Sequence, residues 1–406
     1  MSARRGLEEE TALIQQRIKW WRLKRKLSQQ VVADLAGIDR TYLSKIESGA
    51  ARLDSRSTID RISRALDVSY AELTGQPLRP DTPELQAAHT AIGRIRTAHL
   101  TSDLHDGADI QPRPLPQLAP LVDAAAEAWQ RCDYPAAGGQ LGEVISELYA
   151  HTAAGDQQAL PRLVTALDTA AWTARVLGHH DLAHALAVRG LEAARHAEDP
   201  ALIGWSEFTR ALMTTAAGAG QDNVHLMARR IAERAIAALS PQANNPVRMQ
   251  VMGMLHLAAA RADIAAGGDG ETLLSEAEQL AERTGEGDAF RLHFGPTNVA
   301  IWRVHIIQER REGGRAVAVA QGVRLEAIPS LSRRSMFYRH LGLALAQERG
   351  REQDAVRMLA RAEAITPGKL RLDPLATHTV EHLRSRARAN AGGADLLKLA
   401  RQVGVI

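Results

Sequence analysis

Apolar residues recur at spacings of three and four along most of the chain, which is the period of an amphipathic helix. In segment 12–27 these positions are Leu13, Ile14, Ile18, Trp21 and Leu23, and the opposite side is strongly basic. The pattern returns in short segments up to residue 75 and in longer ones from residue 84 onward. The chain is therefore predicted to be all-α.

Capping residues divide the first part of the chain into five short helices. Ser28, Asp39 and Ser57 are the predicted N-caps of the second, third and fourth helices, because their side-chain oxygens accept hydrogen bonds from open backbone N–H groups. Gly37 ends the second helix, since glycine adopts positive φ without strain. The fifth helix closes at Gly75. Only three residues separate the second helix from the third, which indicates a helix-turn-helix.

The rest of the chain reads as a connection followed by helical hairpins. Prolines at positions 77, 80 and 83 break any helix there and stiffen the chain. We therefore predict a head at 1–76, a linker at 77–117 with one helix near 84–104, and a repeat domain at 118–406. In this last part about seven pairs of helices are expected, joined by turns that contain Gly, Asp or Pro.

Composition supports a helical protein of two or more units. The chain has 406 residues, 4% aromatic residues, and by inspection an excess of Ala, Leu and Arg, which favour helices over strands. We expect alanine where helices cross closely. Arg outnumbers Lys 44 to 6, a bias associated with high-GC bacterial genomes.

Several protein classes are excluded by the sequence. The chain contains no run of about 18 apolar residues, which is the length needed to span a membrane. Its first residues have no apolar core and so do not form a signal peptide. The single Cys132 can form neither an internal disulfide nor a cysteine-based zinc site, which indicates a reducing, cytoplasmic location.

Positive charge is concentrated in the head. Residues 12–66 hold twelve Lys or Arg and five Asp or Glu, a surplus of seven, whereas the whole chain has a net charge of +3. The remaining residues therefore carry a net charge of −4. A basic head on a slightly acidic body predicts a polyanionic partner for the head alone.

The head resembles the Cro/C1-type (XRE) helix-turn-helix family. The residues that carry this resemblance are S-Q-Q-x-x-A-x-x-A-G-I-x-x-x-Y-L-S-K-I-E-x-G from Ser28 to Gly49, followed by S-T and A-L-D-V-S. Ala33 is small where two helices cross, and Leu43 and Ile46 face the core. The resemblance implies a five-helix, lambda-repressor-like domain that binds double-stranded DNA with its third helix in the major groove. The remaining alternative is a helical bundle that does not contact DNA.

The family pattern implies specific DNA contacts. The third helix presents the candidates for reading bases, among which Arg40 and Lys45 could donate to guanine. Gln29 and the loop arginines match positions that contact phosphate, which fixes register without reading sequence. The implied DNA-binding set is Gln29, Arg40, Thr41, Ser44, Lys45, Arg52 and Arg56.

For four other positions of the head and for Glu47, the sequence predicts less specific roles. Lys24 and Arg25 are further candidates for phosphate contacts. Trp20 and Trp21 are expected to pack in a core or an interface rather than insert into DNA. Glu47 is expected to pair locally, because phosphates would repel its carboxylate.

The second part of the chain resembles the tetratricopeptide-repeat superhelix. The best match is LGLALAQERGREQDAVRMLARAEAITP, where Leu341, Gly342, Ala355, Ala362 and Pro367 occupy the family's characteristic positions. The resemblance implies stacked helical hairpins that enclose a concave groove for peptides or small ligands. Large or charged residues on the first helices of pairs are the candidate effector site: Trp172, Trp205, Arg261, Asn298, Trp302 and Tyr338. The alternative is that these tryptophans fill the cores between repeats.

Nothing in the sequence favours catalysis. The segment GGDG at residue 267 is not followed by the Lys-Ser/Thr of a phosphate-binding loop, and no HExxH pattern is present. We predict neither a metal nor a cofactor, and no enzymatic activity.

The whole chain is similar to bacterial regulators that join an XRE head to a tetratricopeptide-like body. This implies a homodimer on a partly palindromic operator, controlled by a peptide or small-molecule effector. Two alternatives stay open: a scaffold that sequesters a partner protein and uses DNA only as a tether, and a regulator without any effector.

Overall fold

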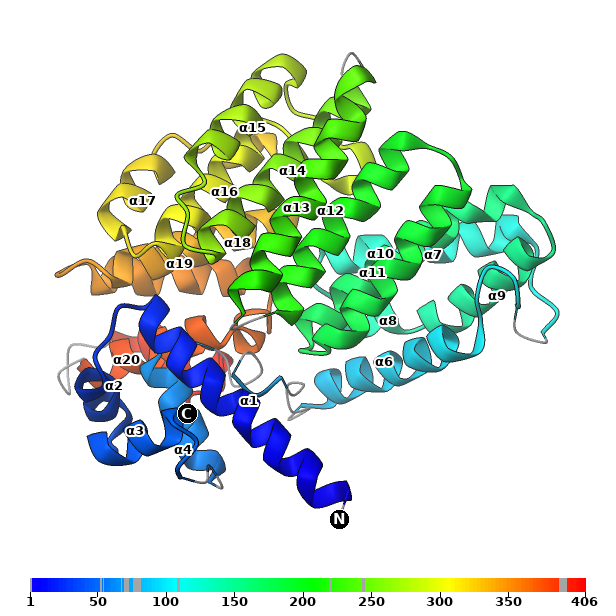
Figure 1. Ribbon diagram of the computed structural model, residues 1–406. Coiled ribbons are helices and arrows are strands. Elements are labelled where there is room, and N and C mark those ends of the chain that lie inside the picture. The colour runs from blue at the N-terminus through cyan, green and yellow to red at the C-terminus, as the bar shows by residue number, and fades with distance from the viewer. Residues whose placement is uncertain are drawn as a thin grey trace.

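The fold is described from a computed structural model that covers residues 2–51, 53, 55–66, 68, 73–75, 82–107, 110–218, 221–242, 245–386 and 393–406. Within these ranges every regular element is a helix and no strand occurs. The prediction of an all-α chain with a helix-turn-helix head and a helical body is confirmed (Figure 1).

The head has a hydrophobic core of its own. Its helices are α1 (Ser2–Lys24), α2 (Gln29–Ala36), α3 (Arg40–Glu47) and α4 (Arg56–Ala65). Ile18, Ala33, Leu43 and Ile46 are completely buried in this core, as the pattern predicted for the last three. Leu13 and Leu23, by contrast, are 45% and 57% exposed, because they lie off the side of α1 that carries the buried Ile14 and Ile18.

The cap of α4 differs from the prediction. Ser55, not Ser57, is the N-cap, and its hydroxyl accepts a hydrogen bond from the backbone N–H of Thr58. Both serines precede the apolar residues, so the sequence alone did not separate them. The fifth predicted helix lies largely outside the described residues.

The next four helices begin the body. They are α6 (Pro83–Thr101), α7 (Leu115–Gln130), α8 (Tyr134–Gly138) and α9 (Leu141–Ala153). Helix α6, predicted as the helix of the linker, packs on α8 and α9. It buries Ile92 and Ile95 in the same core as the hairpins that follow.

The hairpins form a two-layered stack (Figure 1). The even-numbered helices α10 to α20 pack on one another in sequence order, and each also packs on the odd-numbered helix that follows it. The pairs are α10 (Leu160–Val176) with α11 (His180–His196), α12 (Pro200–Ala217) with α13 (Asp222–Leu239), α14 (Pro246–Ala265) with α15 (Glu271–Thr284), α16 (Pro296–Glu309) with α17 (Gly313–Ala320), α18 (Leu331–Ala346) with α19 (Glu352–Ile365), and α20 (Pro374–Arg386) with α21 (Gly393–Gln402). Short 3-10 turns connect some of them: η1 (Gln157–Ala159), η2 (Ser240–Gln242), η3 (Ala289–Arg291), η4 (Leu325–Ala327) and η5 (Leu370–Leu372).

Small residues allow the helices to approach closely. At Gly342 of α18, a Cβ atom would lie 2.8 Å from Cγ of Leu359 on α19. Ala355 and Ala362 of α19 are completely buried. The repeat positions recognised in the sequence therefore lie at the crossing of the two helices.

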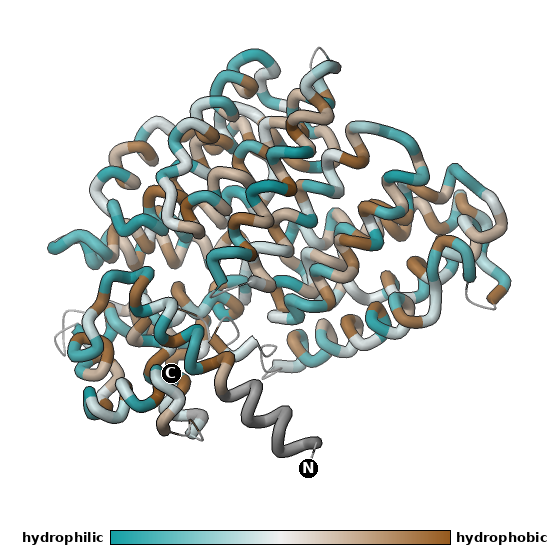
Figure 2. The backbone as a smooth tube through the Cα atoms, in the orientation of Figure 1, coloured by the Kyte–Doolittle hydropathy of each residue, from teal (hydrophilic) through white to brown (hydrophobic). Residues whose placement is uncertain are grey.

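Apolar residues of the body form two clusters that meet at α16. Trp302 and Ile306 belong to the first cluster, and Ile301 and Val304 belong to the second. Hydrophobic and hydrophilic stretches alternate along the other helices, as expected where one face is buried (Figure 2).

The stack curves until its beginning touches its later part. Gln130, at the end of α7, accepts a hydrogen bond of 2.7 Å from Ser330, which caps α18. Gln130 also donates to the carbonyl of Arg291 (3.2 Å), and the Arg291 guanidinium pairs with Asp123 of α7 at 2.9 Å. We call this contact between α7, η3 and the start of α18 the seam.

The crossing at Gly342 predicts opposite effects for two helical glycines. Gly342→Ala should lower the free energy of unfolding by about 1–3 kcal/mol, because the added methyl group forces α18 away from α19. Gly93→Ala in α6 should instead raise it by about 0.5–1 kcal/mol, since a Cβ there meets no atom within 4 Å. Urea unfolding followed by circular dichroism measures both. A destabilised Gly93→Ala variant would contradict the packing argument.

Candidate DNA-binding surface and interior cleft

The turn between α2 and α3 is held by three local features. The Ser28 hydroxyl accepts a hydrogen bond from the Val31 N–H at the start of α2. Gly37 ends α2 with φ +61°, the left-handed conformation that favours glycine. The Asp39 carboxylate caps α3 through the N–H groups of Thr41 (2.7 Å) and Tyr42 (3.3 Å), and these bonds lower the Asp39 pKa. The predicted caps and turn are confirmed.

Helix α3 presents a polar face away from the core of the head. Leu43 and Ile46 point into the core, whereas Arg40, Thr41 and Lys45 are exposed. The partly exposed Ser44 follows Arg40 by four residues, one turn along the same side of the helix. The four residues predicted to read bases therefore share one accessible surface; their role in DNA binding stays a prediction.

A buried ion pair supports α3 from behind. The Arg22 guanidinium on α1 donates to both carboxylate oxygens of Glu47, at 2.6 and 2.8 Å. The pKa of Arg22 is raised chiefly by this hydrogen bond. Gln29, predicted to contact phosphate, donates its amide to Glu47 at 2.9 Å. Glu47 thus pairs locally, as expected, and also orients Gln29 at the start of α2.

The two remaining residues predicted to contact DNA are Arg52 and Arg56. Arg52 lies outside the described residues. Arg56 is the first residue of α4, and only its backbone is described.

Helix α1 fastens the head to the body. Trp20 donates through Nε1 to Asp222 of α13 at 2.9 Å, and its ring lies 5.7 Å from that of His225. Lys24 donates to the carbonyl of Ala265 at the end of α14 (2.7 Å) and lies 4.5 Å from the Trp20 ring centre. Trp20 is therefore an interface residue, as expected.

The phosphate contact predicted for Lys24 is not compatible with its position in the structure. Lys24 was a candidate for a phosphate contact, but its ammonium group faces the body, where burial lowers the pKa of Lys24 to about 8. No local pattern indicates this orientation, since a lysine in a basic helix has the same neighbours in sequence whether it faces DNA or protein. A second contact joins Arg64 of α4 to Glu381 of α20 at 3.0 Å.

A polar cluster lies behind the Lys24 contact. Glu309 of α16 accepts a hydrogen bond from His305 (3.0 Å) and lies 3.8 Å from the Arg261 guanidinium. The His305 ring stacks on that of His340 at 3.9 Å. Arg261, predicted to meet an anionic effector, therefore has Glu309 as a partner within the chain.

An aromatic cleft lies on the inner side of the stack, at the seam. Trp172 of α10 lies between Trp129 of α7 (5.5 Å between ring centres) and Phe208 of α12 (6.4 Å). Trp205 of α12 stacks on Phe290 of η3 at 4.8 Å, with the rings only 10° from parallel. The cleft is completed by polar side chains, among them Asp168, Arg291 and Arg333.

The loop that carries Phe290 has an unusual backbone. Phe290, Arg291 and His293 have φ values of 52°, 57° and 50°, in the left-handed region. Each costs about 1–2 kcal/mol for a residue with a side chain. Buried contacts hold the loop: the Phe294 ring occupies the space beside Gly253, where a Cβ atom would lie 1.9 Å from it, and Asn298 donates to the Leu292 carbonyl at 3.0 Å.

The six predicted effector residues are not brought together. Trp172 and Trp205 line the cleft, and Asn298 supports its loop. Trp302 and Tyr338 are buried in the clusters of the body, and Arg261 lies in the Glu309 cluster. The sequence did not single out the other lining residues, among them Trp129, Asp168, Phe290 and Arg333. Trp129 could have been selected by the same criterion as Trp172, whereas Phe290 lies in a turn and carried no signal.

No described group of three or more His, Cys, Asp or Glu side chains is arranged to hold a metal ion. Of the helices that the structure describes, none combines the length and apolar character needed to cross a membrane.

The fold and the α3 surface define a helix-turn-helix domain joined to a superhelical stack of hairpins. Residues 18–73 match the sequence model of the Helix-turn-helix family, so this segment is an XRE-type helix-turn-helix domain. A search of curated proteins gave no match. Among solved structures, PlcR of Bacillus thuringiensis, crystallised with the peptide PapR7 and DNA, aligns over 93% of this chain and 99% of its own. The identity is 12% and the TM-score 0.29.

The contact between head and body should weaken in acid. Burial first, and then the charges of Lys24 and Arg261, lower the pKa of His225 to about 4, against the opposing effect of Asp222 and Glu309. Once the head detaches, this pKa returns toward about 6.5. The detached state therefore binds more protons between pH 4 and 6.5, and docking is lost as the pH falls through that window.

Hydrogen exchange of residues 12–24, corrected for the intrinsic effect of pH, measures this docking. Protection should fall between pH 6.5 and 4.5 in the native protein and stay constant in His225→Gln. His196→Gln is the matched control, because His196 is exposed on α11 and should keep the pH dependence. An unchanged profile in His225→Gln would show that another group is responsible.

Proposed function

We propose that this protein is a sequence-specific transcriptional regulator of the bacterial cytoplasm. The observation that carries the proposal is the shared accessible face of Arg40, Thr41, Ser44 and Lys45 on α3, set by the capped turn before it. In helix-turn-helix proteins this face enters the major groove, where a basic side chain can donate two hydrogen bonds to guanine.

The charge of the head supports the same proposal. The surplus of seven positive charges in residues 12–66 attracts the DNA backbone and gives affinity that falls with salt. Phosphate attraction by itself does not read a sequence, so the base-facing residues of α3 supply the specificity.

We further propose that two copies bind a partly palindromic operator. One recognition helix contacts only a few base pairs, and two half-sites spaced by one helical turn supply the affinity and selectivity that a regulator needs. The helical stack would then set the distance between the two heads and respond to an effector. An effector can act only by binding the DNA-competent and incompetent arrangements with unequal affinity.

The contact at α1 supports this role of the stack. Trp20 and Lys24 are anchored to α13 and α14, and Arg64 to α20, so the orientation of α3 follows from how the head sits on the body. A shift of these helices would change the position of the recognition helix.

The direct test is selection of an operator from random DNA, followed by affinity measurements at several salt concentrations. Arg40→Ala should weaken operator binding by about 1–3 kcal/mol and relax the preference at one or two positions of each half-site. The control is Lys398→Ala, an exposed charge on α21, which should bind as the native protein does. If Arg40→Ala keeps the native preference, Arg40 does not read the operator. If the native protein binds all duplexes equally, the proposal fails, and a stoichiometric protein partner in a pull-down would favour the scaffold alternative.

A further inference from the structure

Two cations of the body, Arg333 and Lys369, lie close to each other near the seam. Arg333, in the first turn of α18, lines the aromatic cleft. Its backbone N–H donates to Ser330, but its guanidinium has no hydrogen bond or ion pair with any residue in the described ranges. Burial alone lowers the pKa of Arg333 to about 10, so the group stays charged at neutral pH. Arg333 is half-buried, so its charge lines the cleft without a partner among the described residues, and unmatched charges of this kind concentrate at binding sites.

Lys369 lies beside it, in the turn after α19. Its ammonium group donates to the hydroxyl and carbonyl of Ser332, at 3.1 and 3.3 Å. The Cys132 thiol is also within hydrogen-bonding reach. Burial lowers the pKa of Lys369, and the nearby charge of Arg333 lowers it further.

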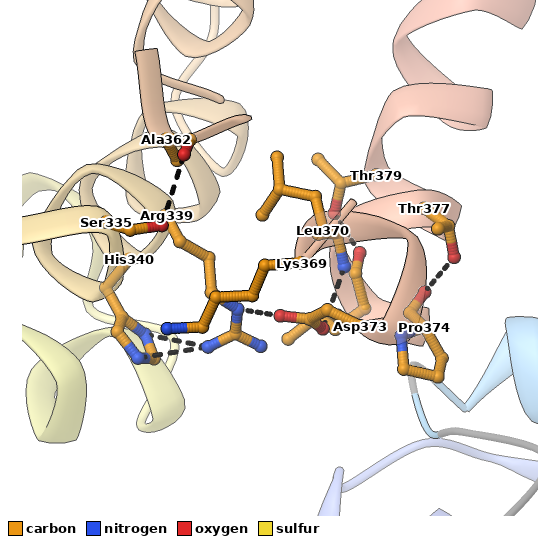
Figure 3. A network of polar contacts seen from close by, with 12 residues as sticks. Ser335, Arg339, His340, Ala362, Lys369, Leu370, Asp373, Pro374, Thr377 and Thr379 are labelled. Carbon is orange, nitrogen blue, oxygen red and sulfur yellow. Dashed lines mark hydrogen bonds and ion pairs between the residues drawn. The ribbon is translucent and has the colours of Figure 1, made fainter. Parts of the chain in front are cut away.

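No carboxylate of the described residues pairs with Lys369. The nearby carboxylate of Asp373 is paired with Arg339, and Figure 3 shows this arrangement from close by. Arg339 also contacts the ring of His340. The start of α18 and the turn after α19 therefore present two cations, Arg333 and Lys369, without a matching negative charge among the residues described.

The walls of the cleft suit a flat apolar group. Trp129, Trp172, Trp205 and Phe290 come from four separate elements, and their rings are tilted or stacked around the same space. Nε1 of Trp129 is buried and has no hydrogen-bond partner among the described residues, so a donor is available at the wall. Buried indole N–H groups ordinarily find an acceptor.

Asp168 does not make the cleft a cation site. Its carboxyl accepts hydrogen bonds from the Thr209 hydroxyl and from the Trp172 side chain, so its acceptor atoms are already engaged. Burial raises the pKa of Asp168 to about 7, and the group is therefore partly neutral at physiological pH. The cation of Arg291 is matched by Asp123. The excess charge is the positive charge of Arg333 and Lys369.

The size of the cavity limits what enters it. Its enclosed volume is about 40 Å³, which holds a few water molecules or a carboxylate but not a whole ring. A ring would lie in the outer part of the cleft, against the aromatic side chains.

We infer that this cleft binds an aromatic carboxylate, with the carboxylate against Arg333 and the ring against the tryptophans; Lys369 does not line the cleft, but its charge lies close to Arg333 and adds to the attraction for an anion. The inference names the class of effector for the stack and in that respect rests on the proposed function. Such an anion would neutralise two like charges at the seam, and it would hold the start of α18 close to α7.

The test uses the full chain without DNA and follows tryptophan fluorescence and isothermal titration calorimetry. The probes are phenylacetate, the neutral phenylacetamide and the cationic phenethylamine. Phenylacetate should bind with a dissociation constant of about 1 mM or lower, at least about tenfold tighter than either of the others. The tripeptide Gly-Gly-Phe and its C-terminal amide form a second pair of probes. If the tripeptide acid binds more tightly than phenylacetate, the natural carboxylate is a peptide C-terminus. If it binds more weakly, the natural ligand is a small organic acid.

The variants separate recognition from packing. Arg333→Gln should weaken phenylacetate at least about tenfold and leave phenylacetamide unchanged, because only the charged contact is removed. Arg349→Gln removes an exposed cation after α18 and should bind as the native protein does. Since the Arg333 side chain has no partner to lose among the described residues, its variant should keep the native circular dichroism spectrum and melting temperature.

Three results would overturn the inference: no binding of either carboxylate probe, equal binding of the amide or amine, or unchanged phenylacetate binding in Arg333→Gln. Operator binding is measured separately with the native protein. Carboxylate binding without DNA specificity would refute the proposed function and leave the cleft assignment standing. DNA specificity without carboxylate binding would refute the cleft assignment and leave the proposed function standing.

Discussion

The body depends on one packing constraint: each hairpin can bury its apolar face only against its neighbours. Helix α12 packs on α14, α14 on α16 and α16 on α18, so removing any one pair would expose the faces on both sides. The close approach at Gly342 shows how small residues permit this stacking. Because the helices stack with a constant sense of rotation, the array curves, and Gln130 comes within hydrogen-bonding distance of Ser330.

The head is tied to this array by few contacts. It has a separate hydrophobic core, and within the described residues its hydrogen bonds and ion pair to the body come from Trp20, Lys24 and Arg64. Ion pairs with exposed side chains, such as Arg64 with Glu381, contribute little free energy, about 0–1 kcal/mol. A small change in the body can therefore shift the balance between docked and detached heads, which is the property that a regulator requires.

Several unfavourable terms of the body lie at or near the seam. Left-handed backbone at Phe290 and Arg291 and the unmatched charges of Arg333 and Lys369 all lie in or near one cleft. Elsewhere in the described body, charged groups such as Glu309 and Asp373 have partners. Strain and uncompensated charge persist in a fold when the surrounding contacts over-determine them, and they concentrate at functional sites.

The sequence by itself determined the parts of this protein that depend on neighbours along the chain. Ser28, Gly37 and Asp39 set the helix-turn-helix through bonds that span two or three residues, and the Leu-Gly pair at 341–342 located a hairpin crossing. The same information does not say which of several tryptophans converge, or whether Lys24 faces DNA or protein. Only the tertiary structure decided these points, because the curvature of the stack brings together residues about 200 positions apart, such as Gln130 with Ser330 and Trp20 with Asp222. Curvature is the sum of many small rotations between hairpins, and no local pattern of residues encodes that sum.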